Sequence, residues 1–221
     1  MGQKTKIDLR LYALIDPARA GGHGLAEIAK SIARSATLAQ LRDKHGTTRA
    51  MVEEARAIRA ALGGVPLLIN DRVDVALAAQ ADGVHIGQDD MDAADARRLL
   101  GKDAIIGLSL KTIVQAQAAP LDQLDYVAIG GVFATQSKDS SDPPVGLDGF
   151  KAILAAVRAR VPRMPVAAIA GIGAGNAGAM IGAGADGVAV ISALSLAPDL
   201  ATAAEEMRTI VDAALAKRGG R

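Results

Sequence analysis

Residues 65–91 read VPLLINDRVDVALAAQADGVHIGQDDM, two short apolar runs on either side of an alanine-rich helical pattern. The first run ends in Asn70 and Asp71, and the second run is followed by Asp89 and Asp90. Short runs that are apolar throughout are typical of parallel strands covered on both faces. Because parallel strands end at the same edge of a sheet, we expect Asp71 and Asp90 to lie on one rim, where such folds bind ligands.

The same alternation runs along the whole chain and predicts eight strands and eight helices. The expected strands cover residues 9–15, 37–41, 65–70, 83–86, 104–108, 126–129, 166–169 and 187–191. The expected helices cover residues 25–33, 48–62, 73–80, 92–100, 113–118, 147–160, 176–183 and 200–217. This pattern predicts an α/β fold, a single (β/α)8 TIM barrel over residues 1–221, with flexible ends at 1–8 and 218–221.

A faint internal repeat agrees with a barrel. Ala-Asp-Gly-Val occurs at residues 81–84 and again at 185–188, each time entering a strand. The repeat favours two related half-barrels over a chance match in a chain rich in Ala and Gly. Asp82 and Asp186 would lie at the face opposite the ligand rim, where a capping role is expected.

Composition excludes several classes of function. Of the 221 residues half are apolar, the net charge is +1, and there is no cysteine, so disulfides, thiolate zinc sites and cysteine nucleophiles are excluded. Two Tyr, two Phe and no Trp argue against base stacking on nucleic acid. With no basic block and no long apolar run, we expect a cytoplasmic protein without nucleic-acid or membrane partners, possible homo-oligomerisation being left open.

Charged residues at the predicted strand ends indicate an anion site. Gln40, Arg42 and Lys44 alternate, so along an extended chain their side chains point to one side. Arg and Lys suit phosphate oxygens, and the paired carboxylates Asp71 and Asp90 suit a hard divalent cation. A salt-bridged strand end is the structural alternative for Arg42 and Lys44.

Two further segments complete the expected rim. Residues 130–145 form a long irregular stretch, which we interpret as a mobile loop over the site. Gly171 and Gly173, with the small residues after the last strand, match the phosphate site of TIM barrels. The chain therefore predicts two anion sites, for two phosphorylated substrates or one long one. His85 is expected to pack or hydrogen-bond near the barrel wall.

Five stretches carry a resemblance to a known family: QLRDK at 40–44, NDR at 70–72, GVHIGQDD at 83–90, GLS at 107–109 and ADGV at 185–188. In their order and spacing the chain resembles the thiamine-phosphate synthases over nearly its whole length. Those TIM-barrel transferases join hydroxymethylpyrimidine diphosphate to a thiazole phosphate, giving thiamine monophosphate and diphosphate, with Mg²⁺ as cofactor.

The resemblance implies roles for individual residues. It implies that Asp71 and Asp90 ligate Mg²⁺. It implies catalytic contributions from Arg42, Lys44, Ser109 and Lys138. It implies substrate contacts by Gln40, Leu41, Arg42, Asp43, Lys44, Asn70, Ser109, Thr135, Gln136, Ser137, Lys138, Gly171, Ile191 and Ser192.

The chain departs from the family pattern at three places. Ser137 replaces the second Thr of a Thr-x-Thr motif, Ala170 replaces the first Gly of a Gly-Gly-Ile motif, and Lys111 stands where a His is usual. Two alternatives stay open: a related thiazole tautomerase, which is an isomerase that needs no metal and uses that His, and a non-catalytic barrel that binds thiamine precursors. The aspartate pair and Lys111 speak against the first.

Overall fold

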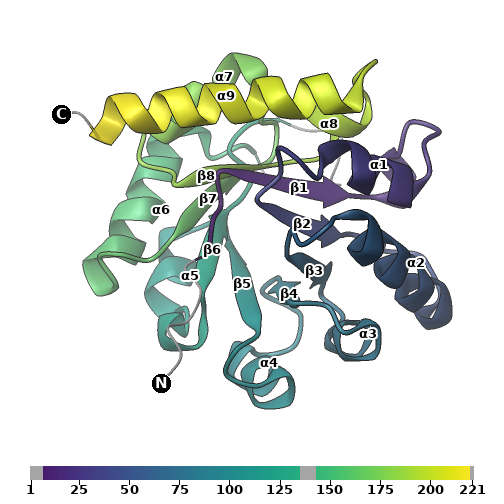
Figure 1. The fold of residues 1–221 in the computed structure, drawn as a ribbon. Coiled ribbons are helices and arrows are strands. Elements are labelled where there is room, and N and C mark those ends of the chain that lie inside the picture. The colour runs from purple at the N-terminus through teal and green to yellow at the C-terminus, as the bar shows by residue number, and fades with distance from the viewer. Residues whose placement is uncertain (1–6, 135–142, 220–221) are drawn as a thin grey trace.

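The computed structural model describes residues 7–134 and 143–219, and within them eight parallel strands close into a barrel (Figure 1). Each strand pairs with the next along the chain, and β8 pairs with β1. The TIM-barrel prediction is therefore confirmed. The strands are β1 (Leu11–Ile15), β2 (Leu38–Leu41), β3 (Leu67–Asn70), β4 (Gly83–Ile86), β5 (Ile105–Leu110), β6 (Tyr126–Ile129), β7 (Val166–Ile169) and β8 (Gly187–Val190).

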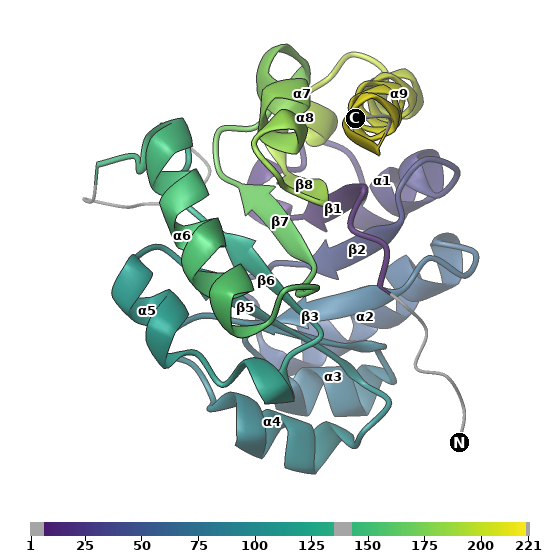
Figure 2. The same ribbon diagram turned by 90° about the vertical axis from the view of Figure 1, so that its left-hand side faces the viewer.

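The main helices lie outside the strands (Figures 1 and 2). They are α1 (Leu25–Ile32), α2 (Thr48–Ala61), α3 (Val73–Ala79), α4 (Ala93–Leu100), α5 (Ile113–Ala118), α6 (Gly146–Arg160), α7 (Ala174–Gly182) and α9 (Leu200–Gly219). Among these described helices, none combines the length and the apolar character needed to cross a bilayer.

Short elements were missed at the sequence level. A four-residue helix, α8 (Ser192–Ser195), follows β8, and two 3₁₀ turns cover Pro17–Arg19 and Leu121–Gln123. Segments this short show no helical periodicity, so a pattern search cannot find them. The prediction also ended the fifth strand at Leu108, whereas β5 runs to Leu110 and so contains Ser109.

The core has two layers. Side chains such as Ile28, Ile58 and Phe150 fill the larger layer between strands and helices. A smaller cluster inside the barrel contains Tyr12 and Tyr126, both fully buried, among Leu and Ala side chains. Small and large residues thus share the barrel interior, as the taper of a closed barrel requires.

The two copies of the Ala-Asp-Gly-Val repeat form equivalent contacts at the face of the barrel opposite the ligand rim. The Asp82 carboxylate accepts a hydrogen bond from the first amide of β3 (2.8 Å), and Asp186 accepts one from the first amide of β7 (2.9 Å). A Cβ atom at Gly83 or Gly187 would lie 1.8 or 1.6 Å from a neighbouring backbone oxygen, so only glycine fits. The predicted capping role of Asp82 and Asp186 is confirmed.

Two residues near the ends of the described chain form ion pairs. Asp8, which we placed in a flexible start, forms an ion pair with Arg10 at 2.6 Å. Arg218, which we placed in a flexible end, belongs to α9 and donates to the carbonyl oxygen of Ala185 at 2.5 Å and to Asp186 at 3.1 Å.

Candidate active site at the barrel mouth

The strand ends bring two carboxylates and a cation together at one mouth. Lys44 forms an ion pair with the carboxylate of Asp71, and the Asp71 and Asp90 carboxyl groups lie within hydrogen-bonding reach of each other. Asp90 Oδ2 also accepts a hydrogen bond from the amide of Gly87 at 2.7 Å. Burial and the neighbouring Asp90 carboxyl raise the pKa of Asp71, although Lys44 opposes the shift. The expectation that Asp71 and Asp90 share a rim is confirmed.

Arg42 is oriented by a residue that the sequence analysis overlooked. Its Nη1 lies 2.5 Å from Oδ2 of Asp16, a carboxylate that is only 3% exposed. The other Asp16 oxygen accepts from the amide of Ala18 at 2.9 Å. The sequence analysis ended the first strand at Ile15 and gave Asp16 no role. The contact could have been predicted, because Asp16 follows β1 and Arg42 follows β2, and these two strands are neighbours.

The residues of segment 40–44 do not all point into the mouth of the barrel. Gln40 is buried inside the barrel, and its Nε2 donates to Oδ1 of Asn70 at 2.9 Å. Leu41 packs on the opposite face, in the layer between strands and helices, so its side chain does not reach the mouth. The Asp43 carboxylate accepts hydrogen bonds from the amides of His45 (2.9 Å) and Gly46 (2.8 Å) and thereby holds the turn before α2.

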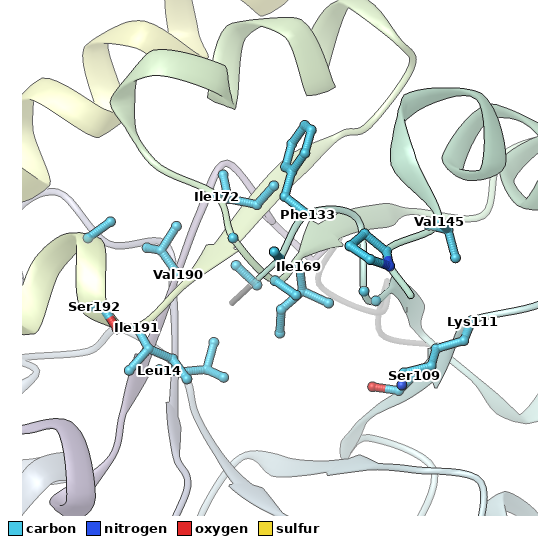
Figure 3. A pocket seen from close by; sticks show the side chains of 18 of the residues that line it. Leu14, Ser109, Lys111, Phe133, Val145, Ile169, Ile172, Val190, Ile191 and Ser192 are labelled. Carbon is cyan, nitrogen blue, oxygen red and sulfur yellow. The ribbon is translucent and has the colours of Figure 1, made fainter. Parts of the chain in front are cut away.

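A pocket of about 470 Å³ opens beside these charged groups (Figure 3). In Figure 3, Ser109 lies across the pocket from Leu14 and Ile191. The predicted site residues that line it are Arg42, Ser109, Gly171, Ile191 and Ser192. Sequence reasoning missed its apolar wall, to which Leu14, Phe133, Ile169 and Ile172 contribute.

The turn after β7 has a conformation that demands glycine. Gly171 has φ +67°, and a Cβ atom there would lie 2.6 Å from Cβ of Phe133. Asn176 holds the turn by donating to the carbonyl oxygen of Gly171 and accepting from the amide of Gly173, both at 2.9 Å. Ala170, where the family often has glycine, has φ +83°, a left-handed conformation that costs energy for alanine.

The segment 130–145 is described only in part. Thr135, Gln136, Ser137 and Lys138 lie outside the described residues. On either side of them the chain is tied to the rim, because the amide of Val132 donates to Ile169 (3.4 Å) and the amide of Gly146 donates to Val132 (3.0 Å). The segment therefore begins and ends next to the pocket.

The residues at the mouth fit a magnesium ion. Within the described part of the chain no group of three or more His, Cys, Asp or Glu side chains gathers into a metal cluster. Mg²⁺ does not require one, since it commonly takes one or two carboxylates and completes its shell with water and substrate phosphates. Two adjacent carboxylates repel each other, and a divalent cation between them would remove that repulsion.

Inside the barrel lies a polar group that the sequence analysis did not anticipate. His85 was predicted to pack or hydrogen-bond near the barrel wall. It lies within the barrel, with Nδ1 2.7 Å from the hydroxyl of Tyr126 and Nε2 2.8 Å from Oγ of Ser109. Tyr126 in turn donates to Tyr12 at 2.9 Å. The only two tyrosines of the chain both fall in predicted strands, and this could have indicated polar contacts inside the barrel.

Comparison with known proteins gives a consistent result. A family model described as thiamine monophosphate synthase matches residues 11–194. The chain is 54% identical over 217 residues to a thiamine-phosphate synthase of Agrobacterium fabrum, an alignment that covers 97% of this chain and 99% of that protein. A thiamine-phosphate synthase of Chloroflexus aurantiacus is 45% identical over 208 residues, with 93% and 94% covered.

Comparison with solved structures supports the same fold. A thiamine phosphate pyrophosphorylase from Pyrococcus furiosus superposes with a TM-score of 0.81 at 33% identity, covering 95% of this chain and 98% of that one. A 3-hexulose-6-phosphate synthase superposes with a TM-score of 0.65 at 18% identity and shares the fold alone.

Proposed function

The chain belongs to the thiamine monophosphate synthase family, and on this basis we propose that it couples hydroxymethylpyrimidine diphosphate to a thiazole phosphate, forming thiamine monophosphate and diphosphate. The observation that carries the proposal is the pairing of two compartments at one mouth. One is charged and contains Arg42, Lys44, Asp71 and Asp90. The other is the largely apolar pocket next to it.

The charged compartment suits the diphosphate. Asp71 and Asp90 would hold Mg²⁺, which when bound supplies positive charge to the departing diphosphate. Arg42 is held in place by buried Asp16 and can present its remaining N–H donors to phosphate oxygens. Lys44 adds a point charge beside Asp71. Lys138, by resemblance, would add another from the segment 135–142.

By resemblance, Ser109 contacts the pyrimidine at the edge of the pocket, and the rest of the pocket suits the thiazole phosphate. Its walls at Ile169, Ile172 and Ile191 are apolar and would contact the thiazole ring. The left-handed turn at Gly171 and Ser192, which also lines the pocket, offer backbone and hydroxyl groups for the phosphate. By resemblance, Thr135 and Ser137 would contribute further hydroxyl groups.

The reaction requires no covalent bond between the substrates and the protein. The bond between the pyrimidine methylene and the diphosphate oxygen breaks, and its electron pair leaves with the diphosphate. The resulting carbocation is stabilised by the pyrimidine ring, and the thiazole nitrogen donates its electron pair to form the new C–N bond. Arg42 and Lys44 stabilise the charge that grows on the leaving group, which is the largest electrostatic change in the reaction. Apolar pocket walls limit the access of water to the cation.

The cellular location and the partners of the enzyme are also part of the proposal. We expect it to act in the cytoplasm on small phosphorylated molecules, without nucleic-acid partners, because its net charge is +1 with no basic block. A homo-oligomer is compatible with this proposal.

The test is direct. The purified protein is incubated with both phosphorylated precursors and Mg²⁺ while diphosphate release is measured, with each precursor or the metal omitted in turn. We expect release only when all three are present. Isomerisation of the thiazole without release of diphosphate would support the tautomerase alternative. Tight binding of the precursors without turnover would support a non-catalytic barrel.

The metal ligands are tested by the double variant Asp71→Asn, Asp90→Asn. We expect at least about 1000-fold lower turnover, because removing the charge that stabilises a leaving group costs several kcal/mol. The matched control is Asp95→Asn on α4, where the exposed carboxylate pairs with exposed Arg98. Wild-type turnover by the double variant in a chelated buffer would exclude the metal role.

A further inference from the structure

A chain of hydrogen bonds crosses the barrel interior and ends at the mouth on both sides. Its members come from β1 to β6, one from each strand. The links are Asn70 to Gln40 (2.9 Å), Gln40 to Tyr12 (2.7 Å), Tyr12 to Tyr126 (2.9 Å), Tyr126 to His85 (2.7 Å) and His85 to Ser109 (2.8 Å).

The orientation of the Gln40 amide sets the direction of every link, because each phenol carries only one proton. Gln40 donates through Nε2 to Asn70, which leaves its Oε1 to accept from the hydroxyl of Tyr12. The Tyr12 proton is thereby used, so the Tyr126 hydroxyl donates to the Tyr12 oxygen. Burial raises the pKa of both tyrosines, so both keep their protons at physiological pH.

The direction continues through His85. Because the Tyr126 proton is used on Tyr12, the Tyr126 oxygen must accept, and His85 Nδ1 is the donor. In the neutral imidazole the other nitrogen is then an acceptor, so His85 Nε2 accepts from the hydroxyl of Ser109. The oxygen of Ser109, which lines the pocket, is left with lone pairs for a ligand.

Packing holds the rings of this chain in place. The rings of Tyr12 and Tyr126 meet edge to face at 5.8 Å between centroids, and His85 stacks on Tyr126 at 5.6 Å. A Cβ atom at Gly107 would lie 2.0 Å from the Tyr126 ring, so glycine at this position makes room for it. The hydroxyl positions are thus fixed by tightly packed rings.

The two ends of the chain present opposite hydrogen-bonding character. At one end Asn70 is 8% exposed, and its Nδ2 finds no hydrogen-bond partner among the described residues. This end therefore holds an unpaired donor just inside the barrel. At the other end Ser109 offers an acceptor, because its own proton is committed to His85.

We propose that Tyr12, Tyr126 and His85 are positioning residues that set the specificity for the pyrimidine substrate, by making Ser109 an acceptor for the exocyclic amino group. An amino group can donate to Ser109, whereas an oxo group at the same ring position would face the Ser109 oxygen with no proton between them. The site then rejects oxopyrimidines through unpaired lone pairs. The identity of the ligand rests on the proposed function, but the tautomer of His85 does not.

The first test measures that tautomer without any mutation. The ¹⁵N chemical shifts of the three imidazoles, His23, His45 and His85, are recorded in the uniformly labelled protein, and His85 is assigned with the variant His85→Gln. We expect the proton on Nδ1 of His85. A proton on Nε2 would overturn the proposal whether or not the protein turns over thiamine precursors.

The second test measures discrimination. Inhibition constants are compared for the monophosphates of the 4-amino and the 4-oxo hydroxymethylpyrimidine, which share their phosphate and differ only at the ring substituent. For the wild type we expect the amino compound to bind at least about 30-fold more tightly, as expected when a buried acceptor is left unpaired. In Tyr126→Phe and in Tyr12→Phe the chain can reverse, so this preference should fall about fivefold or more.

Leu68→Val is the matched control, since it removes a methylene from the same interior cluster and leaves every hydrogen bond in place. We expect it to lower stability and keep the wild-type preference. An unchanged preference in both folded tyrosine variants, or an equal loss in Leu68→Val, would refute the specificity role. Absence of diphosphate release in the wild type, with the Nδ1 tautomer present, would instead count against the proposed function.

Discussion

Gly171→Ala should damage the proposed thiazole phosphate pocket far more than it damages the fold. Gly171 has φ +67°, and forcing alanine into the left-handed region costs about 1–2 kcal/mol. The new Cβ atom would also lie 2.6 Å from Cβ of Phe133 and 2.7 Å from the carbonyl oxygen of Ala134. Since non-bonded atoms prefer about 3.5–4.0 Å, the segment that carries Phe133 must move by about 1 Å.

That displacement has a calculable effect on turnover. A misplacement of about 1 Å in a catalytic site costs about 100-fold in rate. We therefore expect unfolding free energy to fall by about 1–2 kcal/mol, while kcat/KM for the thiazole phosphate falls about 100-fold. Gly175→Ala is the control, because it lies in α7 just beyond the same turn and its Cβ atom would meet nothing within 4 Å.

The assays are urea unfolding followed by circular dichroism, and steady-state diphosphate release with the thiazole phosphate varied at saturating pyrimidine diphosphate. Gly175→Ala should keep wild-type kinetics and gain a little helix stability. If Gly171→Ala kept the wild-type kcat/KM, the turn at Gly171 could not be part of the substrate site. If both variants lost activity equally, the effect would belong to the helix and not to the turn.

Three other changes have defined outcomes. Ala170→Gly should stabilise the protein by up to about 1 kcal/mol, because it removes left-handed strain worth about 1–2 kcal/mol at the cost of greater chain entropy, and a lower melting temperature would contradict this. Asp186→Asn should destabilise the protein by about 2 kcal/mol while activity at low temperature is retained, since this half-buried carboxylate binds Arg158, Arg218 and the first amide of β7 far from the mouth; lost activity in the folded variant would contradict that separation. Asp16→Asn should lower kcat/KM for the pyrimidine diphosphate about tenfold, because Arg42 loses the charge that orients it, and exposed Asp103→Asn is the control that should keep full activity.

Local patterns were informative wherever a residue's role follows from its own strand. Asp82 and Asp186 precede strands, and their capping could be predicted because such carboxylates meet the first amide of a neighbouring strand. Asp71 and Asp90 follow strands, and their meeting at the mouth follows from parallel pairing alone. By contrast, Leu41 was included with its neighbours in the substrate site, although alternation along β2 turns its side chain toward the helices.

The sequence by itself determined the number and order of the strands, the parallel barrel, and the rim on which the charged residues gather, because apolar periodicity and strand-end chemistry are local properties of the chain. Only the tertiary structure decided what fills the barrel. Tyr12 and Tyr126 are 114 positions apart and meet because the barrel closes, and the partner of Arg42 is a carboxylate 26 positions away. Such contacts depend on register and closure between distant strands, which no pattern along a single strand contains.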